Sequence, residues 1–388
     1  MKNFIFSFVL ILLITTLSNN LYSLPRFSLR TGGTCIDCHV NPSGGNIRNE
    51  SGWSYGKNNL VMFNTFKVEE ETEGEFESSN FIGKNILFGL DLRTQYLYTQ
   101  SSPIDSTSKS DFQKMTGSLY FNIIATENID IFTRYDFIHQ IWEAYGIARI
   151  LPLAGYVKAG QFSPNYGIRL DDHTSYTRGG DLGVLFSKGT RQGLIYDPRY
   201  VETGVEVGFS PLETSLFTVS VGNSGSRTFE KDPSYHARFE IISTPSDDVN
   251  FLFGGSYANF KERKFDRNSF KFANENVSMY GGFFGVGFDQ FTLIGEYNIA
   301  DNLIQKDSTS IAYMIEASYR ITKGLEAILR YDSFDFNSRI NKDELAHLII
   351  GLEFFPYSFV ELRPQYRINI EDPSFKNDAI VLQFHFWY

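Results

Sequence analysis

Cys35, Cys38 and His39 are the residues of this sequence best suited to chemistry. They lie in "TCIDCH" at 34–39, and the 388 residues contain no other cysteine. A Cys-x-x-Cys-His spacing is the attachment signature of haem c. The two thiols form thioethers with the haem vinyl groups, and the adjacent histidine ligates the iron. The sequence therefore predicts one covalent haem c, attached through Cys35 and Cys38, with His39 as axial ligand.

Two other uses of this motif stay open. Zinc could bind both thiolates and the imidazole, but a tetrahedral site needs a fourth ligand, and no second cluster of Cys and His follows nearby. A redox disulfide also suits a Cys-x-x-Cys motif, although the βαβ pattern of thioredoxin-like proteins is absent. We expect haem c in preference to both.

The sixth ligand of the predicted iron has two candidates. Met62 follows His39 by 23 residues, which is enough chain to return to the iron. His173 lies in the long connection 163–199, which could bring its imidazole to the iron. The sequence does not decide between Met62 and His173.

The residues before and after the motif divide into three segments. Residues 1–23 read as a secretory signal peptide, because a short apolar run from Phe4 to Leu17 is followed by a small residue at Ser23. A membrane anchor is the alternative, but the run is short for a spanning helix. Residues 24–63 form a haem-binding segment that could plug a lumen. Residues 64–82 form an acidic linker with six glutamates.

Residues 83–388 show the alternation of strands that have one apolar and one polar face. At 203–209, Val205 and Val207 alternate with Gly204 and Glu206. The chain ends "AIVLQFHFWY", with alternating apolar residues and a terminal aromatic residue. We predict an all-β fold, an antiparallel transmembrane β-barrel in the cell outer membrane. A soluble β-sandwich would give similar alternation.

Connection lengths favour the barrel over the sandwich. Short connections near 126–128, 150–153 and 288–290 alternate with longer polar ones, such as 259–276, as periplasmic turns alternate with outer loops. We count 16 strands, or 18 if Leu182–Phe186 and Gly193–Tyr196 also span. The net charge of -10 argues against a nucleic-acid partner.

Together, the export signal, the motif "TCIDCH" and the terminal aromatic strand resemble the fused monohaem cytochrome c–porins, whose best-known members are outer-membrane iron oxidases. The resemblance implies electron transfer across the outer membrane between an extracellular donor or acceptor and periplasmic cytochromes. It implies partners in outer-membrane lipid, a periplasmic cytochrome or other electron carrier, and extracellular iron or another redox partner. Ferrous-iron oxidase activity is one form of this function. A passive solute porin whose haem segment is a plug or sensor is the alternative.

Overall fold

The computed structural model describes residues 25–63, 79–100, 108–170, 172, 174–180, 193–194, 200–223, 233–246, 248–266, 271–374 and 376–388. The predicted signal peptide, most of the acidic linker, Leu182–Phe186 and His173 lie outside the described residues. No helix in the described part of the chain is long and apolar enough to cross a membrane.

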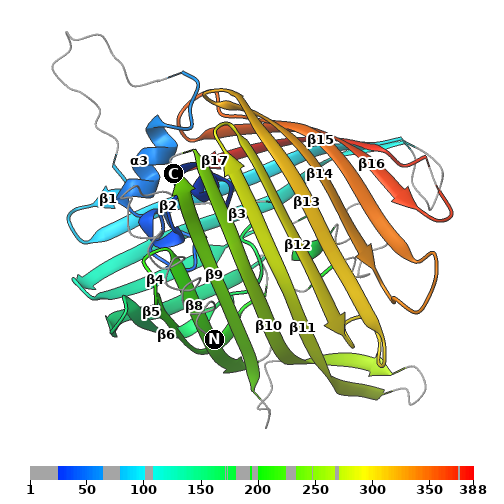
Figure 1. Ribbon diagram of the computed structural model, residues 1–388, viewed down its shortest axis with the longest axis horizontal. Helices are drawn as coiled ribbons and strands as arrows, with labels where there is room; N and C mark the ends of the chain where they lie inside the picture. Colours follow the sequence, from blue (N-terminus) through cyan, green and yellow to red (C-terminus); the bar gives the residue numbers. More distant parts are fainter. Residues whose placement is uncertain are drawn as a thin grey trace, which may run out of the picture.

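Sixteen antiparallel strands form a closed barrel (Figure 1). Each strand pairs with the next from β2 to β17, and β17 pairs with β2 to close the sheet. The strands are β2 (Ile86–Thr99), β3 (Lys109–Thr126), β4 (Ile129–Asp136), β5 (Ile141–Leu151), β6 (Gly155–Phe162), β7 (Glu202–Phe209), β8 (Ser215–Asn223), β9 (Ser234–Ser246), β10 (Val249–Asp266), β11 (Lys271–Phe288), β12 (Phe291–Asp301), β13 (Thr309–Thr322), β14 (Leu325–Asp335), β15 (Glu344–Phe354), β16 (Val360–Glu371) and β17 (Ala379–Trp387). A two-residue strand, β1 (Phe81–Ile82), pairs with the start of β2. The closed sheet confirms the prediction of 16 strands, and the count of 18 is wrong.

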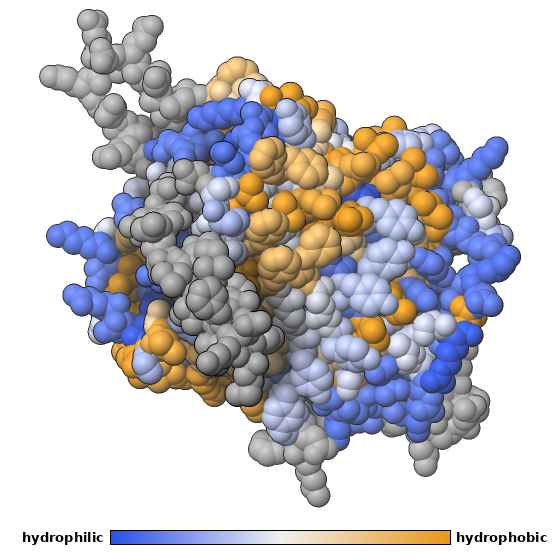
Figure 2. All heavy atoms as spheres, in the orientation of Figure 1, coloured by the Kyte–Doolittle hydropathy of each residue, from blue (hydrophilic) through white to orange (hydrophobic). Residues whose placement is uncertain are grey.

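Alternation along each strand sends apolar side chains outward and polar ones inward. In β7, Val205 is exposed on the outer face while Glu206 is completely buried. The same contrast holds for Leu329 and Arg330 in β14. Figure 2 shows hydrophobic side chains over the middle of the visible face and hydrophilic ones toward its ends. An apolar belt around a polar interior is the pattern of a barrel in lipid, so a soluble sandwich is excluded.

The connections follow the predicted alternation of short turns and long loops, with one correction. The segment 259–276 was expected to be a long loop, but β10 continues to Asp266 and β11 begins at Lys271. The two strands extend as a ladder that pairs Asn259 with Ser278 and Asp266 with Lys271. The extended parts of β10 and β11 have polar residues on both faces. They lack the apolar face that identifies a strand, so their sequence resembles that of a loop.

The N-terminal segment lies inside the barrel, and we call residues 25–63 the plug. It contains helix α2 (Pro25–Thr31), a 3-10 turn η1 (Cys35–Asp37) and helix α3 (Glu50–Asn58). Helix α2 packs on the inner face of β11, where Gly285 and Gly287 leave room for Leu29. Asn250 of β10 also donates a 2.7 Å hydrogen bond to the Leu29 carbonyl. Figure 1 shows this blue segment at the end of the barrel where the chain terminates.

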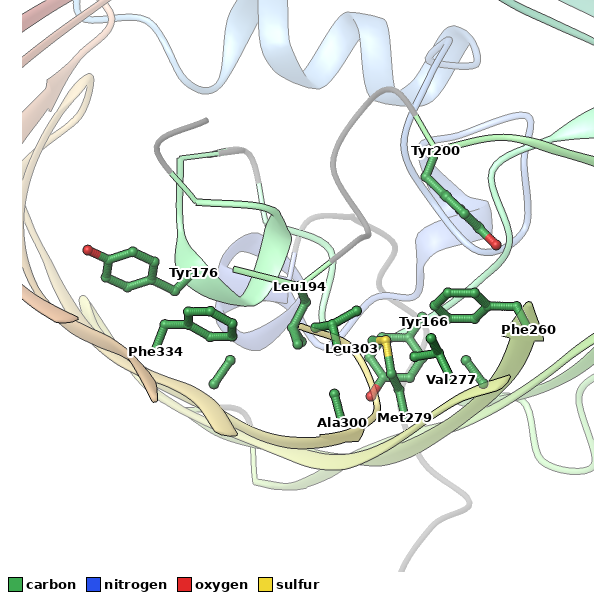
Figure 3. Close-up of a cluster of buried hydrophobic side chains, with 12 residues drawn as sticks. Tyr166, Tyr176, Leu194, Tyr200, Phe260, Val277, Met279, Ala300, Leu303 and Phe334 are labelled. Atoms are coloured by element: carbon green, nitrogen blue, oxygen red, sulfur yellow. The ribbon is translucent and has the colours of Figure 1, made fainter. Parts of the chain in front are cut away.

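The described residues of the connection between β6 and β7 lie in another part of the lumen, and we call these residues (163–170, 172, 174–180, 193–194 and 200–201) the lumen loop. Its short 3-10 turn η2 (Tyr176–Arg178) brings buried side chains onto inward-facing residues of the wall. Figure 3 shows Tyr176 and Leu194 of the loop beside Phe334 and Leu303. The cluster comprises Tyr166, Tyr176, Leu194, Tyr200, Ala258, Phe260, Val277, Met279, Ala300, Leu303, Ala312 and Phe334. Apolar contacts therefore hold the loop inside the barrel.

We predict that Gly287→Val will displace α2 from the wall. A Cβ at this position would lie 2.1 Å from the Leu29 carbonyl oxygen, and backbone cannot move aside cheaply. Conductance in planar bilayers should rise as the plug loosens, while the barrel keeps its heat-modifiable migration on a denaturing gel. Gly282→Val is the matched control, because that glycine is exposed on the same strand and its Cβ would meet only Gly254 O at 3.7 Å. Equal conductance for both variants would contradict this packing.

Candidate functional site

The cysteine motif forms a compact turn at the centre of the plug. The Asp37 carboxylate accepts hydrogen bonds from Thr34 N at 2.7 Å and Thr34 Oγ1 at 2.8 Å. The amide of His39 donates to the Cys35 carbonyl at 3.0 Å. These bonds fix the backbone on both sides of the two cysteines, so their relative position is set by local structure.

The chain after the motif returns to cover it. Gly44 and Gly45 adopt φ values of +81° and +75°, which place the turn in the left-handed region that glycine tolerates. The amide of Asn49 then donates to the Cys38 carbonyl at 2.9 Å. Gly52 of α3 packs directly on this carbonyl, since a Cβ there would lie 2.2 Å from Cys38 O. The stretch "NPSGGNIRNESGW" therefore serves to bring α3 against the motif.

A cavity of about 240 Å³ lies beside Cys38 and His39 within the lumen. Its lining includes Phe27, Cys38 and His39 from the plug and Tyr120, Tyr145 and Phe162 from the wall. Flat aromatic walls suit a planar apolar ring system. The cavity therefore offers a histidine, one cysteine and aromatic surfaces to a common space.

The imidazole of His39 is buried, and its Nδ1 has no hydrogen-bond partner among the described residues. Burial lowers the pKa of His39 to about 3, and the charge of Arg48 adds to this effect. The ring is therefore neutral at physiological pH, which is the form that ligates a metal ion. An unpartnered buried ring nitrogen is uncommon in a folded protein.

Cys35 faces a different space from Cys38. It lines a smaller cavity of about 30 Å³ with Tyr156 and Glu240, and its Sγ lies 3.8 Å from Glu240 Oε1. Burial, with the charge of Glu240, raises the pKa of the Cys35 thiol, which keeps it protonated. Both cysteines are free thiols. Within the described residues, no group of three or more His, Cys, Asp or Glu side chains is placed to hold a metal ion.

Positive charge around the larger cavity exceeds its local compensation. Four of the lining cations have carboxylate partners, in the pairs Arg93–Asp91, Arg134–Glu143, Lys158–Glu206 and Arg178–Glu296. Arg169 has no ion pair among the described residues, and Ser43 Oγ lies 3.5 Å from its Nη2. Burial and the neighbouring Arg238 lower the pKa of Arg169. An anion in the cavity would stabilise this guanidinium.

Of the two candidates for a sixth ligand, Met62 lies in the described part of the chain and is not brought to His39. Met62 lies at the rim of the barrel, where its amide donates to Phe355 O at 2.8 Å and its backbone covers Gly324. It does not line the cavity beside His39. His173 lies outside the described residues.

Two arginines of α2 fasten the plug to carboxylates of the wall. Arg26 lies 2.5 Å from Glu353 and 3.7 Å from Glu326, and Arg30 also pairs with Glu326. Burial alone would lower the pKa of Arg26, but the nearby carboxylates outweigh it and raise the value. The i, i+4 spacing of the arginines places both on one side of the helix. We call this group the plug latch.

The lumen loop is fastened by polar contacts of the same kind. Asp172 accepts from Arg330 at 2.5 Å, and Tyr176 Oη lies 2.9 Å from His347 Nε2. Although burial opposes its ionisation, Arg330 holds the pKa of Asp172 well below its usual range. Carboxylates of the wall therefore pair with arginines of the plug, and an arginine of the wall pairs with an aspartate of the lumen loop.

Sequence analysis missed the residues that surround the motif. Arg26, Arg30 and Arg169 carried no recognisable motif, and Gly52 looked like an ordinary loop glycine. One usable signal was present, because the inward positions of β13 to β16 are rich in glutamate and need cations. Two arginines in the first segment after the predicted signal peptide could have supplied them.

Comparisons with known proteins bear on the barrel only. No protein-family model matches the chain. No curated protein matches it either.

Solved structures with a similar fold are outer-membrane channels and porins. The outer membrane channel DcaP of Acinetobacter baumannii is 13% identical, with a TM-score of 0.54, and the match covers 78% of this chain and 97% of that one. Pseudomonas putida OprB is 8% identical, with a TM-score of 0.56 and coverage of 78% and 94%. An anion-selective porin from Comamonas acidovorans is 10% identical, with a TM-score of 0.52 and coverage of 78% and 99%. The chain has the fold of outer-membrane porins, which with its apolar belt supports the expected outer-membrane location.

We predict that Arg26→Gln will release the plug latch. Removing the cation leaves Glu353 and Glu326 less compensated in the lumen, and breaking a buried pair in this way typically costs about 3–5 kcal/mol. Protease should then cut residues 25–63 in the folded barrel, where the wild type resists. The double variant Arg26→Gln, Glu353→Gln should recover part of the protection, because the unpaired carboxylate is also removed. Protection that is unchanged in the single variant would show that the latch is not needed.

Proposed function

We propose that the chain is a one-haem cytochrome–porin that transfers electrons across the outer membrane. The haem c would be attached through Cys35 and Cys38, with His39 on the iron. The single observation that carries this proposal is the position of His39, a neutral histidine with an unpartnered ring nitrogen, beside an aromatic-lined cavity in the lumen.

The residues around the cavity support the attachment of such a group. Cys38 and His39 line the same space, and Phe27, Tyr120 and Phe162 offer apolar surfaces to it. Attachment through both thiols requires the Cys35 side chain to leave Glu240 and turn toward that space. When bound, haem c supplies a one-electron carrier whose potential depends on its axial ligands and surroundings.

The filled lumen favours electrons over solutes as the cargo. The plug and the lumen loop both pack on the inner wall with buried contacts. A solute needs a continuous aqueous path, whereas an electron can cross packed protein between redox centres over short distances. The proposed function therefore includes a periplasmic electron carrier at one end and an extracellular donor or acceptor at the other, with ferrous iron as the first donor to test.

A passive porin is the second candidate, and the fold favours it. The structural neighbours named above are channels and porins, and one is described as anion-selective. Excess positive charge around Arg169 would suit an anionic solute. In this case the plug would move to open the pore, and the cysteine motif would serve as a sensor.

We predict that Cys35→Ser, Cys38→Ser will abolish both haem attachment and electron transfer. The wild type should give one haem-staining band on a denaturing gel, because thioether bonds survive denaturation, and the double variant none. In proteoliposomes that enclose oxidised cytochrome c, an external impermeant reductant should reduce the enclosed protein through the wild type only. Bilayer conductance is measured in parallel. A wild type without haem, or equal reduction rates for both proteins, would reject the conduit, and high wild-type conductance would support the porin.

We predict that Arg169→Gln will lower the midpoint potential of the attached haem. A positive charge near the cavity favours the reduced iron, and one charge at this range is worth on the order of tens of millivolts. Arg169 would also neutralise a haem propionate, so its loss should make the potential vary more strongly with pH near neutrality. Arg169→Lys is the control that retains the charge. A potential and a pH profile unchanged in Arg169→Gln would place the haem away from this residue.

A further inference from the structure

The cysteine motif reaches the short-turn end of the barrel beside two particular turns. Ala154, in the turn between β5 and β6, and Ser210 and Glu213, between β7 and β8, line the small cavity that contains Cys35 and Ile36. The two turns are joined by a 2.9 Å hydrogen bond from Ser210 N to Leu153 O. This part of the rim therefore lies directly beside the motif.

Three hydrophobic side chains are exposed on this part of the rim. Ile36 is 39% exposed, Leu153 57% and Leu212 39%. They come from the plug and from the two turns that flank it. Exposed apolar residues that converge from separate segments next to a functional motif indicate a contact surface.

Backbone conformation at Leu153 strengthens this interpretation. Leu153 and Ala154 have φ values of 58° and 50°, in the left-handed region that Asn and Gly adopt easily and branched or bulky residues do not. A large apolar residue here strains the turn, and its side chain is left uncovered by the rest of the chain. Neither feature benefits the chain itself, and strain of this kind concentrates at functional sites.

The exposed charged side chains of the turns nearest the motif are acidic. The turns on either side of the motif expose Glu127, Glu213, Asp248 and Asp289, and the described residues of these turns include no lysine or arginine. Lys84 and Arg149 border the Glu127 turn, and Arg149 is paired with Asp130. The exposed lysines at this end, Lys84 and Lys323, lie in the connections before β2 and between β13 and β14. The acidic turns therefore face a partner with positive charge.

We propose that this rim binds a small basic periplasmic protein that carries a one-electron redox centre. The docking face consists of Ile36, Leu153 and Leu212 at its centre and Glu127, Glu213 and Asp248 around it. This inference rests on the proposed function, because it assumes haem at the motif. One electron passes between the iron of the haem and the redox centre of the partner, so one is oxidised as the other is reduced, and no bond is made or broken.

Cytochrome c from mitochondria is a suitable probe, because it is basic and can be made acidic by succinylation of its lysines. Binding is measured with full-length haem-loaded protein in nanodiscs at low ionic strength. Glu213→Gln, Asp248→Asn should weaken binding of the native probe by on the order of tenfold and reduce its dependence on salt. The matched control Asp111→Asn, Asp307→Asn makes the same change of charge in exposed residues at the other end. It should bind like the wild type.

Leu153→Asn gives a second, independent test. Asparagine tolerates the left-handed conformation, so the barrel should become more resistant to heat. Loss of the apolar side chain should weaken binding of the cytochrome c probe. Weaker binding with raised stability supports the docking face. Binding unaffected by the rim variants, or equal binding of the succinylated probe, overturns it while the haem remains. Absence of haem staining in the wild type defeats the proposed function itself.

Discussion

Buried carboxylates on the inner wall of the barrel are the constraint on which the rest of the structure depends. Sixteen strands enclose a lumen too wide for side chains alone to fill, and the inward positions of neighbouring strands carry Glu316, Glu326 and Glu353. Carboxylates in such a space need water or cations. Arg26 and Arg30 of the plug supply the cations. Charge therefore holds the plug in place, and the plug in turn positions the cysteine motif.

The barrel could be predicted from sequence because its signals are local. Alternation in a strand such as β7, and an apolar strand at the chain end, follow from a period of two residues and require no knowledge of distant contacts. The error at 259–276 has a physical cause, since strands that extend beyond the membrane lose the apolar face that marks them. The predicted number of strands was still right, because the error concerned the length of β10 and β11 and not their existence.

The site was only partly predictable, for a different reason. The spacing of Cys35, Cys38 and His39 is visible in the sequence, whereas their surroundings come from residues more than a hundred positions away, such as Tyr145 and Arg169. The role of Gly52 is also not visible in the sequence, because it depends on the close approach of this residue to the Cys38 carbonyl. Met62 was chosen as a candidate ligand from chain length alone, and it lies at the rim of the barrel instead.

The filled lumen and the acidic rim are consistent with one another under the proposed function. Under the proposed function the plug and the lumen loop occupy the lumen and electrons are the cargo, and an electron requires close approach of its partners rather than an open path. The motif lies near the short-turn end, where Cys35 is only partly covered. A carrier docked at that end would approach the haem closely, whereas the lumen loop separates the haem from the opposite side. Electron transfer between the haem and the extracellular partner would therefore be slower than transfer between the haem and the periplasmic carrier. The aromatic cluster that the lumen loop forms with the wall lies among the elements that fill the barrel.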